Sequence, residues 1–120
     1  MRILIADDQR SVGTMLAAMV VDCQHEVVEV VGSGLEAIQA YDKYKPDVVL
    51  MDYWMAKLNG ATACRNILAK DPTARIILVS AWQPAHDMAA EAGAIAVISK
   101  PVDLHRLEAA LADAAQMLAF

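Results

Sequence analysis

The chain has 120 residues, a net charge of -5 and a hydrophobic fraction of 58%, which exceeds the average of about 45–50% for soluble domains. This length predicts one domain over residues 1–120, and the acidic balance disfavours binding to nucleic acid or to an anionic membrane surface. No apolar run approaches the ~18 residues of a membrane span, and the N-terminus does not resemble a signal peptide, so we expect a cytoplasmic protein.

The first half of the chain alternates short apolar strands with amphipathic helices. Apolar residues that recur every three or four positions predict each helix, and Leu35, Ile38 and Tyr41 form the apolar stripe of the second one. The predicted elements are strands over Arg2–Ala6 and Val27–Val31, and helices that end near Asp22 and near Lys45, before Pro46.

A continuous apolar run forms the next predicted strand, Asp47–Met51. Such a run is typical of a strand that is buried on both faces of a parallel sheet. Asp52 falls where this strand ends. Because ligands of open α/β sheets bind beyond the carboxyl ends of the strands, Asp52 is a candidate functional residue.

The second half of the chain continues the alternation. The predicted elements are a helix over residues 61–68, a strand over Ala74–Val79 that ends at Ser80, a helix from near Pro84 to Gly93, a strand over Ala94–Ile98 and a last helix over Leu104–Leu118. The fourth helix has an inward face of mostly alanine with Met88, so it should be the least well anchored helix. Five βα units in strict alternation predict an α/β fold with a parallel sheet and right-handed crossovers.

Polar side chains follow four of the five predicted strands. Asp7 and Asp8 follow the first, Asp52 the third, Ser80 the fourth and Lys100 the fifth. In a parallel sheet these groups share one edge, where three carboxylates repel each other unless a cation neutralises them. Oxygen ligands without His or Cys favour a hard ion, most plausibly Mg2+.

The same edge has the groups that phosphoryl transfer needs. A divalent cation, the ammonium of Lys100 and the hydroxyl of Ser80 around one carboxylate would stabilise a transferring phosphoryl group. The carboxylate of Asp52 can itself be the nucleophile, which gives an aspartyl phosphate.

With these residues in this order, the chain resembles the receiver domain of bacterial two-component response regulators, in its chemotaxis-regulator-like single-domain form. The resemblance implies a doubly wound, flavodoxin-like sheet of five parallel strands in the order 2-1-3-4-5 with five helices. It also implies that a histidine kinase or phosphotransfer protein phosphorylates Asp52, and that water later removes the phosphoryl group without turnover of an external substrate. Asp7, Asp8, Asp52 and the backbone carbonyl of Trp54 would hold Mg2+, Ser80 and Lys100 would contact the phosphoryl group, and the Lys100–Pro101 bond would be cis.

Two departures from the family pattern affect the expected switch. Val97 stands where the family usually has an aromatic residue, three positions before Lys100, and Ala56 stands where a proline is usual. Phosphorylation is expected to draw in Ser80, shift the loop at Ala81 and reorder the fourth helix. The surface from that helix to the last one would then bind a partner, an output domain or a second copy in a homodimer.

Two tryptophans, Trp54 and Trp82, lie on loops beside the predicted site. Their large side chains suggest either a gate for water or for the phosphodonor, or partly packed anchors of the two loops.

Other interpretations remain open at this stage. Gly32-Ser33-Gly34-Leu35-Glu36-Ala37 matches the dinucleotide fingerprint, although it leaves the strand-end residues without a role. An aspartyl phosphatase would have a second acid where Trp54 stands. Asp7 or Asp8 can simply cap the first helix. A receiver-like interaction module that is never phosphorylated is the main alternative, and Val97 is the feature that favours it.

Overall fold

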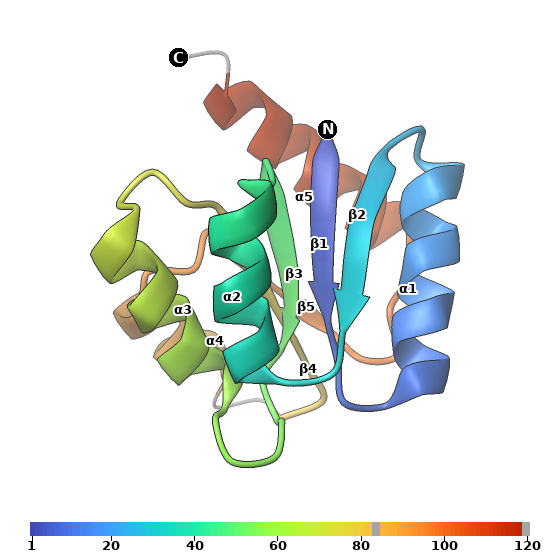
Figure 1. Cartoon of the computed structure of the whole chain (residues 1–120). Coiled ribbons are helices and arrows are strands. Elements are labelled where there is room, and N and C mark those ends of the chain that lie inside the picture. The colour runs from blue at the N-terminus through green and yellow to red at the C-terminus, as the bar shows by residue number, and fades with distance from the viewer. Residues whose placement is uncertain (83–84, 119–120) are drawn as a thin grey trace.

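The computed structural model of the chain describes residues 1–82 and 85–118 and shows a parallel sheet with helices on both faces (Figure 1). The strands are β1 (Arg2–Ala6), β2 (Glu26–Val31), β3 (Val48–Asp52), β4 (Ile76–Ser80) and β5 (Ala96–Ser99). They are all parallel and lie in the order β2-β1-β3-β4-β5. The predicted fold class and strand order are confirmed.

Five helices connect the strands and divide the core into two layers. They are α1 (Arg10–Asp22), α2 (Gly34–Tyr44), α3 (Gly60–Lys70), α4 (Ala85–Ala92) and α5 (Leu104–Leu118). Side chains of α1 and α5 pack on one face of the sheet, and side chains of α2, α3 and α4 pack on the other. The sheet is therefore buried on both sides, as the apolar strands predicted.

The central strand β3 shows how this burial arises. All five of its residues are buried. Val48 and Leu50 contribute to the layer under α1 and α5, while Val49 and Met51 contribute to the layer under α2, α3 and α4. Each such side chain stabilises the fold by roughly 1.5–3 kcal/mol. The strand that ends in Asp52 is thus held rigidly from both faces.

The C-terminal ends of the last three strands differ from the sequence prediction in the same way. Asp52, Ser80 and Ser99 are the last residues of β3, β4 and β5, whereas the apolar pattern ended each strand one residue earlier. The ladder continues to these residues because Asp52 pairs with Val79 and Ser80 with Ser99. Backbone pairing between neighbouring strands does not depend on whether a side chain is apolar, so hydropathy alone placed the ends too early.

Two of the predicted buried stripes were wrong in detail. Leu35 is 59% exposed, and α2 buries Ala37, Ala40 and Tyr41 instead. In α4 the buried residues among those whose side chains are described are Ala89 and Ala92, as the predicted face of alanines requires, but Met88 is 38% exposed. Gly93 follows α4 with a φ of 89°, as the predicted stop required. The expected start of this helix at Pro84 lies outside the described residues.

The glycines of the dinucleotide-like motif have a structural role. Ser33 caps α2, because its side-chain oxygen accepts a hydrogen bond of 3.1 Å from the backbone N–H of Glu36. A Cβ on Gly34 would lie 2.9 Å from the backbone oxygen of Leu58, so this glycine allows the loop after β3 to approach α2. The motif therefore begins a capped and closely packed helix.

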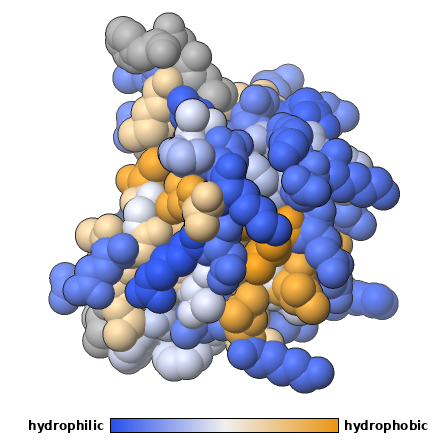
Figure 2. Space-filling view, turned by 60° about the vertical axis from the view of Figure 1, so that its left-hand side comes forward, coloured by the Kyte–Doolittle hydropathy of each residue, from blue (hydrophilic) through white to orange (hydrophobic). Residues whose placement is uncertain are grey.

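The helices turn polar side chains outward. Most of the surface in Figure 2 is hydrophilic, and the hydrophobic residues visible there gather in separate places. Within residues 1–82 and 85–118, no helix combines the length and the apolar character that a membrane crossing requires.

Gly60 provides a test of how tightly the end of β3 is packed. Its backbone N–H donates to the oxygen of Tyr53 at 2.7 Å, and an added Cβ would overlap the backbone oxygen of Asp52. We expect Gly60→Ala to lower the free energy of unfolding by about 1–3 kcal/mol, measured by urea denaturation. Gly32→Ala is the matched control, since a Cβ there meets nothing within 4 Å. Equal stability of the two variants would contradict this packing.

Candidate functional site

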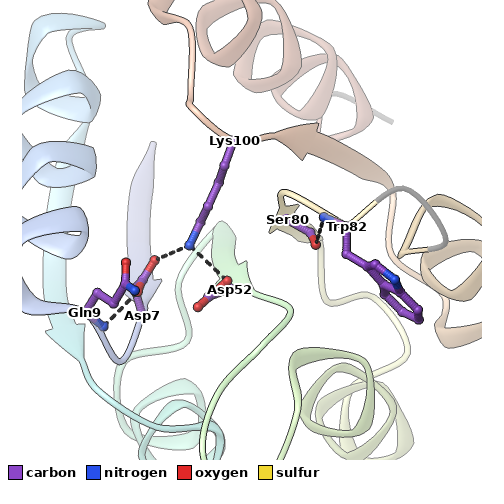
Figure 3. A network of polar contacts seen from close by, with 6 residues as sticks. All are labelled: Asp7, Gln9, Asp52, Ser80, Trp82 and Lys100. Atoms are coloured by element: carbon purple, nitrogen blue, oxygen red, sulfur yellow. Dashed lines mark hydrogen bonds and ion pairs between the residues drawn. The ribbon is translucent and has the colours of Figure 1, made fainter.

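The polar residues predicted from the strand ends do meet at one edge of the sheet (Figure 3). Asp7 follows β1, Asp52 ends β3, Ser80 ends β4 and Lys100 follows β5. Asp7, Asp52 and Ser80 are the buried polar or charged residues of the described chain, whereas Asp8 is exposed. The strand order reverses between β1 and β3, and such a switch point is where ligands bind in open α/β sheets.

Lys100 lies between two of the carboxylates, as Figure 3 shows. Its Nζ is 3.2 Å from Oδ2 of Asp7 and 3.1 Å from Oδ1 of Asp52. Buried charges are tolerated when they are paired, and here one ammonium serves two buried acids. The site therefore has an excess of negative charge that a further cation can neutralise.

This excess appears in the pKa values. Burial, followed by the negative charge of Asp7, raises the pKa of Asp52 to about 6, and Lys100 offsets only part of this effect. Burial by itself would lower the pKa of Lys100, but the hydrogen bond and charge of Asp52 and the charge of Asp7 outweigh it, so the pKa is raised. The ammonium thus stays charged, while the carboxyl of Asp52 ionises reluctantly without a second cation.

The third acid completes a set of oxygen donors. Carboxylate oxygens of Asp7, Asp8 and Asp52 all lie within 4.8 Å of one another. Such a set without nitrogen or sulfur fits a hard divalent cation. Asp8 is exposed, so the cluster opens to solvent on one side, as suits an ion that keeps some of its water.

Neither Asp7 nor Asp8 is the N-cap of α1, which was the alternative role considered for them. The N-cap of α1 is Gln9, which makes no side-chain capping bond. Oδ1 of Asp7 instead accepts a hydrogen bond of 2.9 Å from the backbone N–H of Gln9, which fixes the carboxylate at the edge of the sheet.

Ser80 lies on the other side of Asp52 from Asp7 (Figure 3). Its Oγ accepts a hydrogen bond of 3.0 Å from the backbone N–H of Trp82, and its carbonyl accepts one of 3.0 Å from the N–H of Lys100. The hydroxyl proton is not used in either bond, so it remains available for an acceptor that arrives at Asp52.

The Lys100–Pro101 peptide bond is cis, in agreement with the expectation from the resemblance. Val97 is half-buried on β5 and lines two hollows. One lies against α5 and has a volume of about 380 Å³, and the other lies against α4 and has about 240 Å³. A valine at this position leaves the surface between the two helices indented.

The sequence analysis missed Tyr53 and left open whether Trp82 gates the site or anchors its loop. Tyr53 is 3% exposed, and its ring lies 5.1 Å from that of Trp54 and 5.4 Å from that of Trp82, measured between centroids. The side chain of Trp82 points away from Asp52 in Figure 3, so it does not gate the carboxylate in this conformation. The signal for Tyr53 was its place directly after Asp52, at the end of a buried strand.

The family model of the response regulator receiver domain matches residues 3–112. The chain belongs to this family. It is 39% identical over 118 residues to a chemotaxis protein CheY of Listeria monocytogenes, which covers 97% of this chain and 99% of the relative. It is 38% identical over 112 residues to the CheY protein of Thermotoga maritima, which covers 92% of this chain and 93% of the relative.

A solved receiver domain has the same fold. The protein from Clostridium thermocellum superposes with a TM-score of 0.90 at 24% identity, over 99% of this chain and 98% of that chain. The prediction of a CheY-like receiver domain with phosphoacceptor signalling as its function is confirmed. The individual roles of the site residues stay predictions, including the backbone carbonyl of Trp54 as a metal ligand.

The raised pKa of Asp52 gives a prediction for the metal-free receiver domain. A carboxyl whose folded pKa is about 6, above its ordinary 3.8, destabilises the fold when it is ionised, so stability is lost as the pH rises through this range. In the presence of a chelator we expect Asp52→Asn to raise the free energy of unfolding by about 1–3 kcal/mol near pH 7.5, and by much less near pH 5.

Chemical denaturation at the two pH values measures this difference. Asp42→Asn is the control, because Asp42 is an exposed acid that forms an ion pair with Lys45 on the surface. A gain in stability that does not change with pH, or one that Asp42→Asn reproduces, would contradict the electrostatic origin.

Proposed function

We propose that this receiver domain is switched by transfer of a phosphoryl group from a histidine of a kinase or phosphotransfer protein to Asp52. The observation that carries the proposal is the buried carboxylate of Asp52, which lies 3.1 Å from the ammonium of Lys100 inside a cluster of three acids. A nucleophile, a fixed positive charge and a set of oxygen ligands are the parts that phosphoryl transfer requires.

In the proposed step, a carboxylate oxygen of Asp52 attacks the phosphorus of the phosphohistidine. The new O–P bond forms as the N–P bond breaks, and the electron pair of the broken bond stays on the imidazole nitrogen. Lys100 supplies its charge to the phosphoryl oxygens, and Ser80 donates its free hydroxyl proton to one of them. Both residues lie at the edge where the phosphoryl group would form, so they can stabilise its negative charge.

Asp7, Asp8 and Asp52 would hold Mg2+, and the backbone carbonyl of Trp54 is the proposed further protein ligand. The oxygen-only donor set supports this assignment. A bound Mg2+ would neutralise the negative charge that accumulates during transfer. The chain itself fixes the position of the ion, because β1 and β3 hold two of the acids. When no ion is bound, the charge of Lys100 reduces the repulsion between these two acids.

The proposed cycle ends when water removes the phosphoryl group from Asp52, and no external substrate is turned over. We propose that residues 1–120 act as one receiver unit at its expected cytoplasmic location. The indented surface of α4, β5 and α5 would bind the downstream partner, an output domain or a second copy of the chain. The hollows on both sides of Val97 support this choice of surface.

The alternative of a receiver-like module that is never phosphorylated differs in one observable. It would bind its partner through the same surface with Asp52 unmodified. The burial of Asp52 beside Lys100 favours the phosphoacceptor, since an idle buried carboxylate with a raised pKa would only destabilise the fold.

Phosphorylation can be tested by the intact mass of the chain after incubation with Mg2+ and acetyl phosphate. We expect a gain of one phosphoryl group in the unchanged protein and none in Asp52→Asn, because the nucleophile is lost. Asp42→Asn, a surface acid, should gain as much as the unchanged protein. A folded protein that gains nothing, or an Asp52→Asn variant that still gains a phosphoryl group, would refute the assignment.

Metal binding can be tested separately by calorimetric titration with Mg2+. We expect Asp8→Asn to weaken binding by about tenfold or more, because ligand charge sets the affinity of oxygen sites. Glu36→Gln is a matched control: Glu36 lines the same hollow as Asp7 and Asp8 but lies outside the cluster. Equal losses of Mg2+ affinity in the two variants would show that Asp8 acts only through its negative charge and does not ligate the ion.

A further inference from the structure

The usual aromatic switch residue is absent, because Val97 occupies its position. A valine has no ring that can turn between an inward and an outward orientation. If phosphorylation at Asp52 is to change α4, another connection must carry the change. Among the described residues, a chain of contacts leads from Ser80 to α4 through Trp82, Tyr53 and Met88.

The first contact joins the site to the loop after β4. Oγ of Ser80 accepts a hydrogen bond of 3.0 Å from the backbone N–H of Trp82. The Trp82 ring then packs at 5.4 Å on the ring of Tyr53 and at 5.3 Å on that of Trp54, within the range of favourable aromatic pairs. A movement of the Ser80 side chain therefore acts directly on the backbone that positions the Trp82 ring.

Tyr53 is the fixed point of this arrangement. Its ring is 3% exposed, its N–H donates to the oxygen of Val79 at 2.9 Å, and its oxygen accepts from Gly60 at 2.7 Å. Its hydroxyl donates a hydrogen bond to Sδ of Met88 on α4. One buried side chain thus contacts both the loop after β4 and the helix that is expected to move.

The anchoring of α4 explains why this contact matters. Over residues 87–92, where its side chains are described, the buried ones are Ala89 and Ala92, which fill little volume, whereas Met88 is 38% exposed. Because this buried face is small, few other side-chain contacts fix the position of the helix. The Tyr53–Met88 hydrogen bond is a directional link between this helix and the central sheet.

We propose that Tyr53, packed against Trp82 and hydrogen-bonded to Met88, couples phosphorylation of Asp52 to α4 in place of an aromatic residue at position 97. This inference rests on the proposed function. When the Ser80 hydroxyl turns to the new phosphoryl oxygens, Trp82 loses its acceptor and its ring shifts against Tyr53. The Tyr53 hydroxyl then releases or repositions Met88, and α4 moves with it. Tyr53 acts as a positioning residue and takes no part in the transfer itself.

The test compares amide chemical shifts of the full chain with Mg2+, before and after addition of beryllium fluoride as a mimic of the phosphoryl group. In the unchanged protein, the amides of residues 87–92 should shift. In Tyr53→Phe, which keeps the ring and loses only the hydroxyl, this shift should fall to less than half. Met88→Leu removes the acceptor from the other side of the same bond and should give the same loss.

Tyr41→Phe is the matched control. Tyr41 is also buried, and its hydroxyl also donates a hydrogen bond, of 2.7 Å, to Asp71, the C-cap residue of α3. This variant should keep the full response of residues 87–92. An undiminished response in Tyr53→Phe, or an equal loss in Tyr41→Phe, would overturn the proposed coupling.

Intact mass after incubation with acetyl phosphate separates this inference from the proposed function. Tyr53→Phe should gain one phosphoryl group just as the unchanged protein does, because its hydroxyl is not at the transfer site. If the unchanged protein gains a phosphoryl group but residues 87–92 do not respond, the coupling is wrong and the proposed function survives. If the unchanged protein gains nothing, the proposed function fails, and the coupling fails with it.

Discussion

The site depends on one shared interaction, the contact of the Lys100 ammonium with two buried carboxylates, Asp7 and Asp52. A positive charge offsets the cost of burying either acid in its ionised form, and one charge is too little for both. The remaining imbalance raises the pKa of Asp52 and leaves room for a cation among the acids. The electrostatic strain that weakens the resting fold is thus the same property that prepares the site for a metal ion and a phosphoryl group.

The parallel sheet makes this arrangement possible. Burial on both faces holds β1 and β3 side by side, and their carboxyl ends place acids from distant parts of the chain at one edge. The pairing of Ser80 with Ser99 brings the ends of β4 and β5 to the same edge, so that Lys100 follows directly. The buried sheet therefore holds these charged and polar residues together at one edge, and none of them has the chemistry of the site alone.

The absence of an aromatic residue at position 97 changes how a signal must leave the site. Aromatic side chains are concentrated instead on the loops after β3 and β4, where the rings of Tyr53, Trp54 and Trp82 are in mutual contact. This cluster touches the site through Ser80 and touches α4 through Met88. The switch of this receiver domain is thus best sought beside the transfer site, on the side of α3 and α4.

The sequence by itself determined the element order, the parallel α/β sheet and the five strand-end residues, because hydrophobic periodicity and the order of polar residues are local properties of the chain. The doubly wound strand order followed only from the resemblance to receiver domains. It placed the ends of β3, β4 and β5 one residue early and put Leu35 inside, since pairing and helix rotation depend on neighbours in space. Only the tertiary structure decided that Lys100 bridges two acids, that Trp82 turns away from Asp52 and that Tyr53 reaches Met88. These contacts join residues far apart in sequence, and no pattern along one chain encodes their distances.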